Sequence, residues 1–275
     1  MHLFKKYSDA SKASRWDRWR KIFDLLEDRH VIHISDIIAE TDAKPSVIEK
    51  DIATLSSRGL VKRTAKGGLT LERYHGEKSY DERLKEDVQG KEIIAALASE
   101  KYIVEGMTLF LDGSTTVKAI IPFIANQKLR IITNNLSIIS ELRKSNFPGE
   151  ILCTGGHFRS NANTVVGESA CIMINRYKSD LTILGVEGVS SEMELMEAHP
   201  GEALLKQVMI EHSRRTIILA MPKKFNDDSL LTFATLKDVE ALISTRFPPG
   251  PFADAAKAQG VRLECPASST GNQQV

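Results

Sequence analysis

The residues that could do chemistry gather in short runs that follow apolar segments, and the clearest of these runs is LDGSTT. The apolar stretch stops at Asp112 and Gly113, and Ser114, Thr115 and Thr116 follow before a helical pattern begins. A strand, a turn and a helix start in this order leave backbone N–H groups free where the helix dipole attracts an anion. Gly113 lets the backbone approach a ligand closely, and the three hydroxyls can donate to phosphate oxygens.

Four other apolar segments also end in small, hydroxyl, amide, acidic or basic residues. Ligands of parallel α/β sheets bind beyond the carboxyl ends of the strands, so several such ends are expected to surround one pocket. The repetition favours a ligand site over an ordinary capped turn. The carboxylate of Asp112 would repel phosphate but could accept from sugar hydroxyls or cap the turn. Besides DGSTT, the residues expected to line the pocket are Thr133, Asn134, Asn135, Gly155, Gly156, Glu187, Lys223 and Lys224.

The sequence has no pattern for a metal centre, a disulfide framework or a nucleophilic active site. Cys153, Cys171 and Cys265 are far apart and form no CxxC pair, which argues against zinc and against paired disulfides. His157 and His199 lack a matching cysteine or serine nucleophile signature, and we interpret both as loop residues. We therefore expect neither a metal nor a cofactor.

Residues 91–265 must supply the elements that position these strand ends. Helical patterns of about ten residues alternate with short apolar runs, from KEIIAALASEKY before TLFLD to GEALLKQVMIEHS before TIILAM. The alternation predicts an α/β domain with a largely parallel sheet. A last helix and strand are expected in FADAAKAQG and VRLEC, and residues 266–275 are expected to be disordered.

Residues 1–73 follow a different pattern. An amphipathic helix is expected in WDRWRKIFDLLED, followed by two short helices, of which the first has Ser35 as its expected N-cap and the second begins at Pro45. Two short strands are expected around Lys66-Gly67-Gly68. Short helices joined by a brief turn, and then a basic hairpin, are the outline of a winged helix-turn-helix, a small α+β domain.

This outline predicts a DNA-binding module, in which the second short helix enters the major groove and cations contact the flanking phosphates. Residues 1–73 hold 15 Lys and Arg against 11 Asp and Glu, whereas the whole chain has a net charge of only +1. The alternative is a helical adaptor domain whose charges are merely solvated. The predicted DNA contacts are Ser46, Val47, Glu49 and Lys50 of the second helix and Arg58, Lys62, Arg63 and Lys66 beyond it.

Between the two patterns, residues 74–90 are polar and charge-dense, and we interpret them as a linker that could be partly helical. No apolar stretch approaches the roughly 18 residues of a membrane span. The first residues, MHLFKKYSDASKASRW, lack the apolar core of a secretion signal. These features lead us to expect a cytoplasmic protein without a membrane partner.

Both halves together resemble the DeoR family of bacterial transcriptional regulators, over roughly residues 18–265. The first half is similar to the family's helix-turn-helix in HISDIIAETDAKPSVIEKDIATLSSRGLVKRTAKGGL, and the second half has KEIIAALA, LDGSTT, TNN, TGG, GVEG and a late Lys224 in the family's order. The resemblance implies a repressor of a sugar or sugar-phosphate catabolic operon that binds double-stranded operator DNA. We expect it to act as a homo-oligomer.

The resemblance further implies that the C-terminal domain is similar to ribose-phosphate isomerases and senses a phosphorylated sugar or a related metabolite, which releases the repressor from its operator. Because the isomerases have a lysine near this region, we add Lys206 to the expected effector site. Its position on a helix otherwise suggests a surface lysine, which is the commoner case.

The sequence departs from the family pattern at two places. Where the family has Thr-Ile-Arg-Arg, this chain has residues 47–50 as VIEK; Glu49 could accept from a cytosine amino group but repels phosphates. Where the family has Asp-Ser-Ser-Lys, residues 221–224 read MPKK. An acidic acceptor for sugar hydroxyls is missing and a second cation is gained, which predicts a more anionic or an unusual ligand. A sugar-phosphate isomerase with Glu187 as its base and a protein-binding scaffold are the alternative functions.

Overall fold

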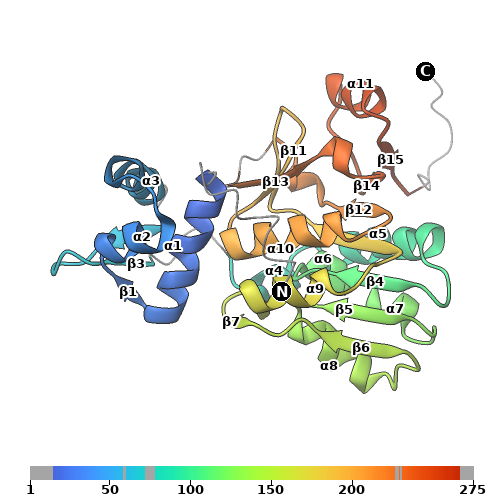
Figure 1. Ribbon diagram of the computed structural model, residues 1–275. Coiled ribbons are helices and arrows are strands. Elements are labelled where there is room, and N and C mark those ends of the chain that lie inside the picture. Colours follow the sequence, from blue (N-terminus) through green and yellow to red (C-terminus); the bar gives the residue numbers. More distant parts are fainter. Residues whose placement is uncertain (1–14, 58–59, 72–77, 227–228, 230, 267–275) are drawn as a thin grey trace. The chain divides into compact units, whose positions relative to one another are not determined.

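The computed structural model describes residues 15–57, 60–71, 78–226, 229 and 231–266, and the chain divides into two compact units, residues 1–77 and 78–275 (Figure 1). The described part of the smaller unit contains three helices and one antiparallel sheet of strand order β1-β3-β2. Its elements are α1 (Arg15–Arg29), β1 (Val31–Ile32), α2 (Ile34–Thr41), α3 (Pro45–Ser57), β2 (Val61–Arg63) and β3 (Leu69–Leu71).

The helices of the smaller unit bury the faces that the sequence predicted. Helix α1 buries Trp19, Ile22, Phe23, Leu25 and Leu26, while α3 buries Ile48, Ile52 and Leu55. The helical period of WDRWRKIFDLLED places Trp16 largely on the same face as these residues, but its side chain lies outside the described side chains. In α3 the apolar residues follow the helical period, and their burial against α1 and α2 leaves the opposite face of α3 exposed.

The predicted N-cap of α2 is wrong. Helix α2 begins at Ile34, and its N-cap is His33, whose backbone N–H donates to Oδ2 of Asp36 at 3.2 Å. Ser35 has the better capping side chain, but the preceding strand β1 ends at Ile32 and leaves His33 as the extended residue before the helix. The short strand β1 was not predicted, since two residues carry no periodicity. Pro45, by contrast, is the first residue of α3 as expected.

The larger unit contains the predicted parallel sheet, with seven strands among the described residues and the order β15-β14-β12-β9-β4-β5-β6. Every neighbouring pair in it is parallel. The six strands β4, β5, β6, β9, β12 and β15 match predicted strands, whereas β14 was not predicted. The strands are β4 (Thr108–Leu111), β5 (Arg130–Thr133), β6 (Glu150–Cys153), β9 (Leu181–Gly185), β12 (Thr216–Leu219), β14 (Ala241–Ile243) and β15 (Arg262–Glu264).

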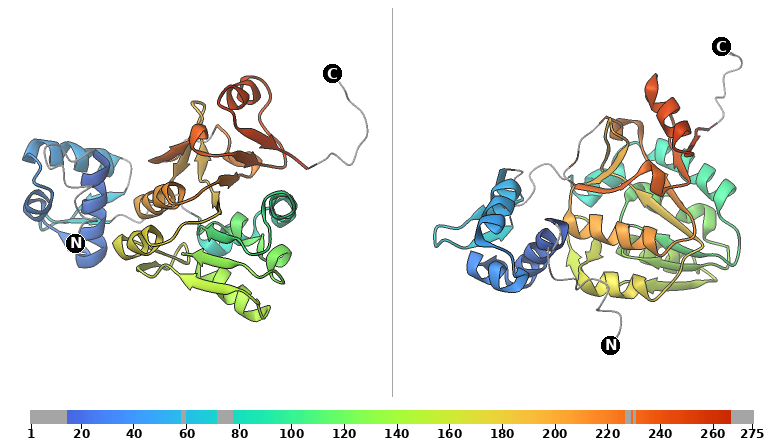
Figure 2. Two further views of the ribbon diagram at one scale, coloured as in Figure 1. Left: turned by 45° about the vertical axis from the view of Figure 1, so that its right-hand side comes forward. Right: turned by 45° about the horizontal axis from the view of Figure 1, so that its top comes forward.

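Helices cover both faces of this sheet. Alternate strand residues such as Leu109, Ile131 and Ile183 share one apolar core with α5 (Val88–Tyr102), α6 (Thr115–Lys118), α7 (Ile121–Ile124) and α8 (Leu136–Lys144). Thr182 points to the opposite face, where its hydroxyl contacts the carbonyl of Met209 in α10 (Pro200–Glu211). Helix α10 packs against α9 (Glu168–Asn175), and Figure 2 shows this pair across the strands from α5.

Two segments differ from their predicted form. Residues 78–90, in the expected linker, hold α4 (Tyr80–Lys85) and the start of α5, and Tyr80 is buried. The helix expected after DGSTT is split into α6 and α7, and Pro122, which has no N–H to donate to the carbonyl of Lys118, lies just after the break. The α6 helix is therefore only four residues long, which weakens the dipole expected at DGSTT.

Short strands that were not predicted lie beside the main sheet. One antiparallel sheet has the order β10-β11-β13, and a hairpin pairs β7 with β8. His157, expected in a loop, is the first residue of β7, and His199 is the N-cap of α10. The remaining elements are β7 (His157–Arg159), β8 (Thr164–Val166), β10 (Gly188–Val189), β11 (Glu194–Glu197), η2 (Pro222–Lys224), β13 (Leu231–Thr235), η3 (Leu236–Asp238) and α11 (Pro251–Ala258).

Candidate functional site

The strand order places two of the predicted site loops at the point where the chain reverses its direction across the sheet. From β4 the chain continues through β5 to β6 on one side, while β9, β12, β14 and β15 extend the sheet on the other. The connections that follow β4 and β9 therefore diverge between neighbouring strands. Such a topological switch point is where open α/β sheets bind their ligands, and here it carries DGSTT and GVEG.

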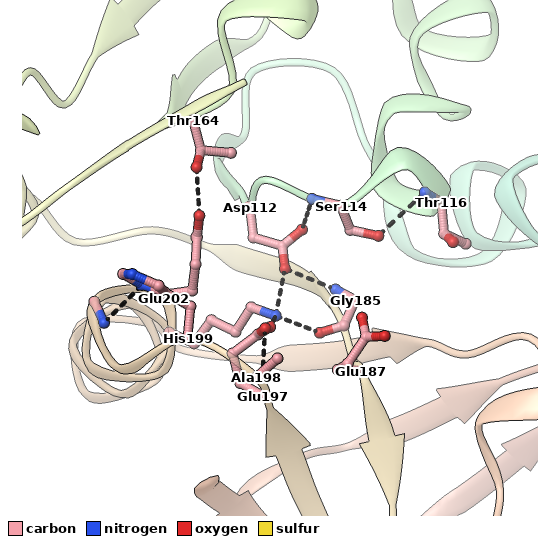
Figure 3. A network of polar contacts seen from close by, with 12 residues as sticks. Asp112, Ser114, Thr116, Thr164, Gly185, Glu187, Glu197, Ala198, His199 and Glu202 are labelled. Atoms are coloured by element: carbon pink, nitrogen blue, oxygen red, sulfur yellow. Dashed lines mark hydrogen bonds and ion pairs between the residues drawn. The ribbon is translucent and has the colours of Figure 1, made fainter. Parts of the chain in front are cut away.

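Asp112 organises this point with its buried carboxylate. One of its oxygens accepts from the backbone N–H of Ser114 and the other from the backbone N–H of Gly185, both at 2.9 Å. The hydroxyl of Ser114 in turn accepts from the N–H of Thr116 at 3.1 Å (Figure 3). The carboxylate thus caps its own turn, the second role that the sequence allowed, and it joins that turn to the end of β9.

Lys206 is not a surface lysine. Its side chain is 6% exposed, and its ammonium donates to the carbonyl of Gly185 at 3.0 Å and to the carboxylate of Glu197. Oδ2 of Asp112 is 3.3 Å from the same nitrogen, and the ring of Phe233 covers it at 5.2 Å. A positive charge is stable here because two carboxylates accompany it. Lys206 therefore joins α10 to the DGSTT turn and to β11.

The pKa values in this cluster follow from burial and from the ion pairs. Burial disfavours the ammonium of Lys206, but Glu197 and Asp112 outweigh that effect and raise its pKa. Burial acts against the carboxylate of Glu197 too, yet Lys206 and the N–H of Ala198 lower its pKa. For Asp112 burial prevails over Lys206 and the two N–H groups, so its pKa is raised.

Two glycines allow the turns to approach one another this closely. A Cβ on Gly185 would lie 2.3 Å from the Ser114 hydroxyl oxygen, and a Cβ on Gly113 would lie 2.3 Å from Cγ2 of Thr164. Both distances are well inside van der Waals contact. Gly113 therefore serves the packing of the turn against β8, and its expected approach to a ligand stays a prediction.

Glu202 is a second buried acid that the sequence analysis missed. Its carboxylate accepts from Nδ2 of Asn134 at 3.1 Å and from the hydroxyl of Thr164, and it pairs with Arg159 at 3.2 Å. Glu202 lies four residues before Lys206 on α10, which places both on one face of the helix; this spacing was a signal that could have identified it. Glu197 gave no such signal, because it lies on the unpredicted strand β11.

Three buried polar atoms at the ends of β5 and β6 have no hydrogen-bond partner among the described residues: Oδ1 of Asn134, Nδ2 of Asn135 and the hydroxyl of Thr154. Asn134 and Asn135 are fully buried, and Thr154 is almost so. The other amide atom of Asn135 caps α8, since it accepts from Ser137 N–H at 2.8 Å. Buried polar groups are ordinarily paired with protein or water, so these atoms are candidates for contact with a polar ligand.

The predicted cations Lys223 and Lys224 are paired with acids. Lys224 lies 2.7 Å from the carboxylate of Glu187, and Lys223 binds Glu86, which also binds Lys78. The hydrogen bonds from Lys223 and Lys78 lower the pKa of Glu86 to about 2. Both predicted cations thus lie at the strand ends, but each would have to exchange its carboxylate for a ligand anion.

Lys91 is a buried cation that the sequence analysis did not single out. Its ammonium donates to the carbonyl oxygen of Arg83, which also accepts from the Thr115 hydroxyl at 3.5 Å. No carboxylate pairs with Lys91 among the described residues. Burial, reinforced by the charge of Lys223, lowers its pKa to about 8. An anion beside Thr115 would supply the missing negative charge.

Gly155 and Gly156 both have positive φ values, of 67° and 124°. A Cβ on Gly156 would lie 2.3 Å from the carbonyl oxygen of Val166. The pair therefore lets the connection from β6 to β7 pass close to β8, and the admission of a ligand beside it stays a prediction.

In the smaller unit, the predicted DNA contacts form an exposed surface on α3 and the β2–β3 hairpin. Glu49 and Arg63 form an ion pair across it, with 2.6 Å between Nη2 and Oε2. Val47 is half-buried and Arg58 lies outside the described residues. The exposed predicted contacts are Ser46, Glu49, Lys50, Lys62, Arg63 and Lys66.

Two kinds of feature are absent from the described part of the chain. No cluster of three or more His, Cys, Asp or Glu side chains there could hold a metal ion. Nor does any helix in that part combine the length and the apolar character that crossing a bilayer requires.

Comparison with known proteins places the chain among regulators. Residues 86–246 match the family model of the DeoR C-terminal sensor domain. The chain is 30% identical to a protein of Bacillus subtilis (strain 168) described as an uncharacterized HTH-type transcriptional regulator FruR, over 81% of this chain and 88% of the relative. It is 27% identical to the glycerol-3-phosphate regulon repressor of Escherichia coli (strain K12), over 90% of this chain and 97% of the relative.

Among solved structures, ribose 5-phosphate isomerase A from Methanocaldococcus jannaschii aligns with 51% of this chain and 54% of its own length, at 15% identity and a TM-score of 0.36. A likeness this distant carries no inference about ligand or activity. The relatives with similar sequences are named as regulators, not as enzymes, which removes the isomerase alternative. The sensor-domain match covers more than half of the chain, and the chain therefore belongs to the DeoR family of transcriptional regulators.

Proposed function

We propose that the chain is a DNA-binding repressor of a sugar or sugar-phosphate catabolic operon, and that a phosphorylated sugar or related metabolite releases it from its operator. Membership of the DeoR family supports the regulatory role. The name of the E. coli relative, a repressor of the glycerol-3-phosphate regulon, supports the class of operon.

The smaller unit would act as a winged helix-turn-helix. Helices α2 and α3 meet at a turn in which Asp42 adopts a left-handed conformation (φ 49°), and β2 and β3 form the wing. In this arrangement α3 enters the major groove. Lys50, Lys62 and Lys66 are exposed and have no carboxylate partner among the described residues, so they are available to phosphates. A homo-oligomer would present two such helices to two half-sites.

The larger unit would hold the effector at the carboxyl ends of its strands. The observation that supports this site best is the group of buried, unpaired polar atoms on Asn134, Asn135 and Thr154. An amide oxygen, an amide N–H and a hydroxyl together match a ligand whose hydroxyls both donate and accept. Lys91 and Thr115 would receive the anionic end of the same ligand. Asp112 and Lys206 would hold the surrounding turns in place.

A gel-shift series tests the DNA-binding half of the proposal. The duplex would carry the region upstream of the chain's own gene, and affinity would be measured at several salt concentrations for the wild type and for Lys62→Ala/Lys66→Ala. Two lost phosphate contacts should reduce the slope of log K against log salt by about 2. Lys128→Ala/Lys144→Ala, which removes two exposed lysines of the larger unit, is the matched control and should behave as the wild type. Equal binding by all three proteins at every salt concentration would contradict the proposal.

A thermal-shift screen against three-, five- and six-carbon sugar phosphates tests the sensing half. A ligand at 100 times its Kd should stabilise the protein by about 2.7 kcal/mol. The same sugars without phosphate should stabilise it less, because they cannot use Lys91. A screen in which no phosphorylated compound raises the Tm would contradict a phosphorylated effector.

A further inference from the structure

The ion pair between Glu49 and Arg63 connects two parts of the DNA-binding surface. Glu49 lies near the start of α3 and Arg63 lies at the end of β2, fourteen residues further along the chain. Nη2 of Arg63 donates to Oε2 of Glu49 at 2.6 Å, and each side chain is 51% exposed. The pair thus lies in the open, on the face that would meet DNA, rather than in the core.

This contact changes the role that each residue can have. Alone, the acid on α3 would repel phosphates and would have to lose its hydration at the groove without compensation. The guanidinium of Arg63 neutralises it and fixes one of its two oxygens. The other oxygen, Oε1, has no partner among the described residues and remains a free acceptor. Arg63, being engaged by the acid, is less available to a phosphate than Lys62 or Lys66.

We infer, on the basis of the proposed function, that Glu49 and Arg63 act together to recognise one base of the operator. Glu49 accepts a hydrogen bond from the exocyclic amino group of cytosine or adenine in the major groove, and Arg63 is the positioning residue that orients it. Guanine presents only acceptors at the equivalent edge, and thymine presents an acceptor and a methyl group. A carboxylate oxygen therefore selects for an amino-bearing base and against both of the others.

The positioning role of Arg63 follows from the length of the glutamate side chain. A free glutamate loses rotamer freedom when it is immobilised at an interface, at a cost of about 0.5–1.5 kcal/mol. The contact from β2 restricts Glu49 before DNA arrives. Removal of Arg63 should therefore lose the base preference that removal of Glu49 loses, at the same position of the operator.

The test is selection of bound duplexes from a randomised library by the full-length protein, followed by affinity measurements on the selected site and its single-base variants. The proteins are the wild type, Glu49→Ala, Arg63→Ala, the double variant and Lys62→Ala as the control. The wild type should prefer cytosine or adenine at one position of each half-site by about fivefold or more. Glu49→Ala, Arg63→Ala and the double variant should each lose most of this preference, and the double variant should be no worse at that position than Glu49→Ala alone. Lys62→Ala should weaken binding to all sequences and keep the preference.

The inference is overturned if Arg63→Ala keeps the preference and weakens all sequences alike, because Arg63 is then a phosphate contact. It is also overturned if the two single variants change different base positions, or if no position prefers an amino-bearing base. These results leave the proposed function standing, since the wild type would still select a sequence. A wild type that selects no sequence removes the proposed function and this inference together. Circular dichroism and retained binding of non-specific DNA show that the variants are folded.

Discussion

Nζ of Lys206 lies 3.3 Å from Oδ2 of Asp112, and the two side chains are 6% and 2% exposed. This buried contact joins α10 to the turn after β4, and the carboxylate of Glu197 extends it to β11. Because Asp112 and Lys206 already satisfy one another, they are better suited to fixing the site than to binding its ligand. In the proposed site, the direct contacts would come from Lys91 and from single polar atoms that lack a hydrogen-bond partner, namely Oδ1 of Asn134, Nδ2 of Asn135 and the hydroxyl of Thr154.

The first prediction concerns this buried cluster. Lys206→Met should lower the free energy of unfolding of the larger unit by about 3–5 kcal/mol, because it leaves two carboxylates buried without a counter-charge. Urea unfolding followed by circular dichroism measures the change. Lys237→Met, at an exposed position, is the control and should change the same quantity by no more than about 0.5 kcal/mol. A loss below 1 kcal/mol for Lys206→Met would show that the carboxylates of Asp112 and Glu197 are accessible to solvent and do not depend on Lys206 for their counter-charge.

The second prediction concerns the close approach of Gly185 to Ser114. Gly185→Ala places a Cβ 2.3 Å from the Ser114 hydroxyl oxygen, so it should displace the DGSTT turn and abolish the thermal shift caused by sugar phosphates. Ser114→Gly removes the atoms that collide, although it also removes the cap of α6. The double variant should therefore recover part of the ligand response. If Gly185→Ala alone responds as the wild type does, the turn is not part of the site.

The third prediction concerns stability at Lys91. Its pKa is lowered from 10.5 to about 8, so the folded state disfavours the ammonium. The charged Lys91 therefore destabilises the folded state, fully so below about pH 8, and this destabilisation decreases as pH rises from 8 to 10.5. Lys91→Met should raise the free energy of unfolding at pH 7, with an upper limit of about 3 kcal/mol. Over pH 8–10.5 the wild type should gain stability relative to the variant, and parallel pH profiles would contradict this.

A fourth prediction concerns ligand binding at the same residue. An anion bound beside Lys91 favours the ammonium and raises its pKa again, so binding takes up a proton above pH 8. Affinity for a sugar phosphate should therefore decrease as pH rises above about 8, beyond any change due to the phosphate itself. Lys91→Met should bind more weakly and lose that dependence. Calorimetry in buffers with different ionisation enthalpies detects the proton; no uptake at pH 8.5 would exclude Lys91 from the site.

The fifth prediction concerns the smaller unit. Arg18 of α1 forms a two-point ion pair with Asp51 of α3, at 2.6 and 3.2 Å, and Asp51 is buried. Asp51→Ala should destabilise this unit by about 3 kcal/mol or more and weaken DNA binding, while the sugar-phosphate response remains. Glu40→Ala removes the exposed pair with Lys21, 3.2 Å apart, and should cost less than about 1 kcal/mol. Equal losses in the two variants would show that burial of Asp51 contributes nothing.

The sequence predicted those helices and strands that are marked by a pattern within their own residues. Apolar runs identified β4, β5, β6, β9 and β12, a strand was expected in the segment VRLEC where β15 lies, and Pro45 marked the start of α3. Strand β14 was not predicted because ALI is short and follows a charged segment. Strand β11 was not predicted because MELMEAH mixes methionine and glutamate without alternation. Such strands form because distant partners are available, as β13 is for β11.

The loops of the candidate site could be predicted from the sequence, but the burial and pairing of its charged side chains could not. The hydroxyl and amide residues at the strand ends were readable because they interrupt apolar runs. The burial of Lys91, Glu197, Glu202 and Lys206 depends on which helices and strands pack over them, and an isolated lysine or glutamate in a helix ordinarily indicates a solvated surface. The pairing of Glu49 with Arg63 likewise depends on how β2 lies against α3.

The proposed coupling between the two units is that one ligand at the strand ends controls the affinity of α3 and the wing for DNA. It is tested most directly by measuring the Kd for the selected operator with and without a saturating concentration of the sugar phosphate that gives the largest thermal shift. The same pair of measurements is made on Lys91→Met. We predict that the ligand weakens operator binding by the wild type about 5- to 150-fold, a coupling of about 1–3 kcal/mol, and that Lys91→Met binds the operator normally without responding. An unchanged operator Kd for the wild type in saturating ligand, or an equal response from Lys91→Met, would contradict the account.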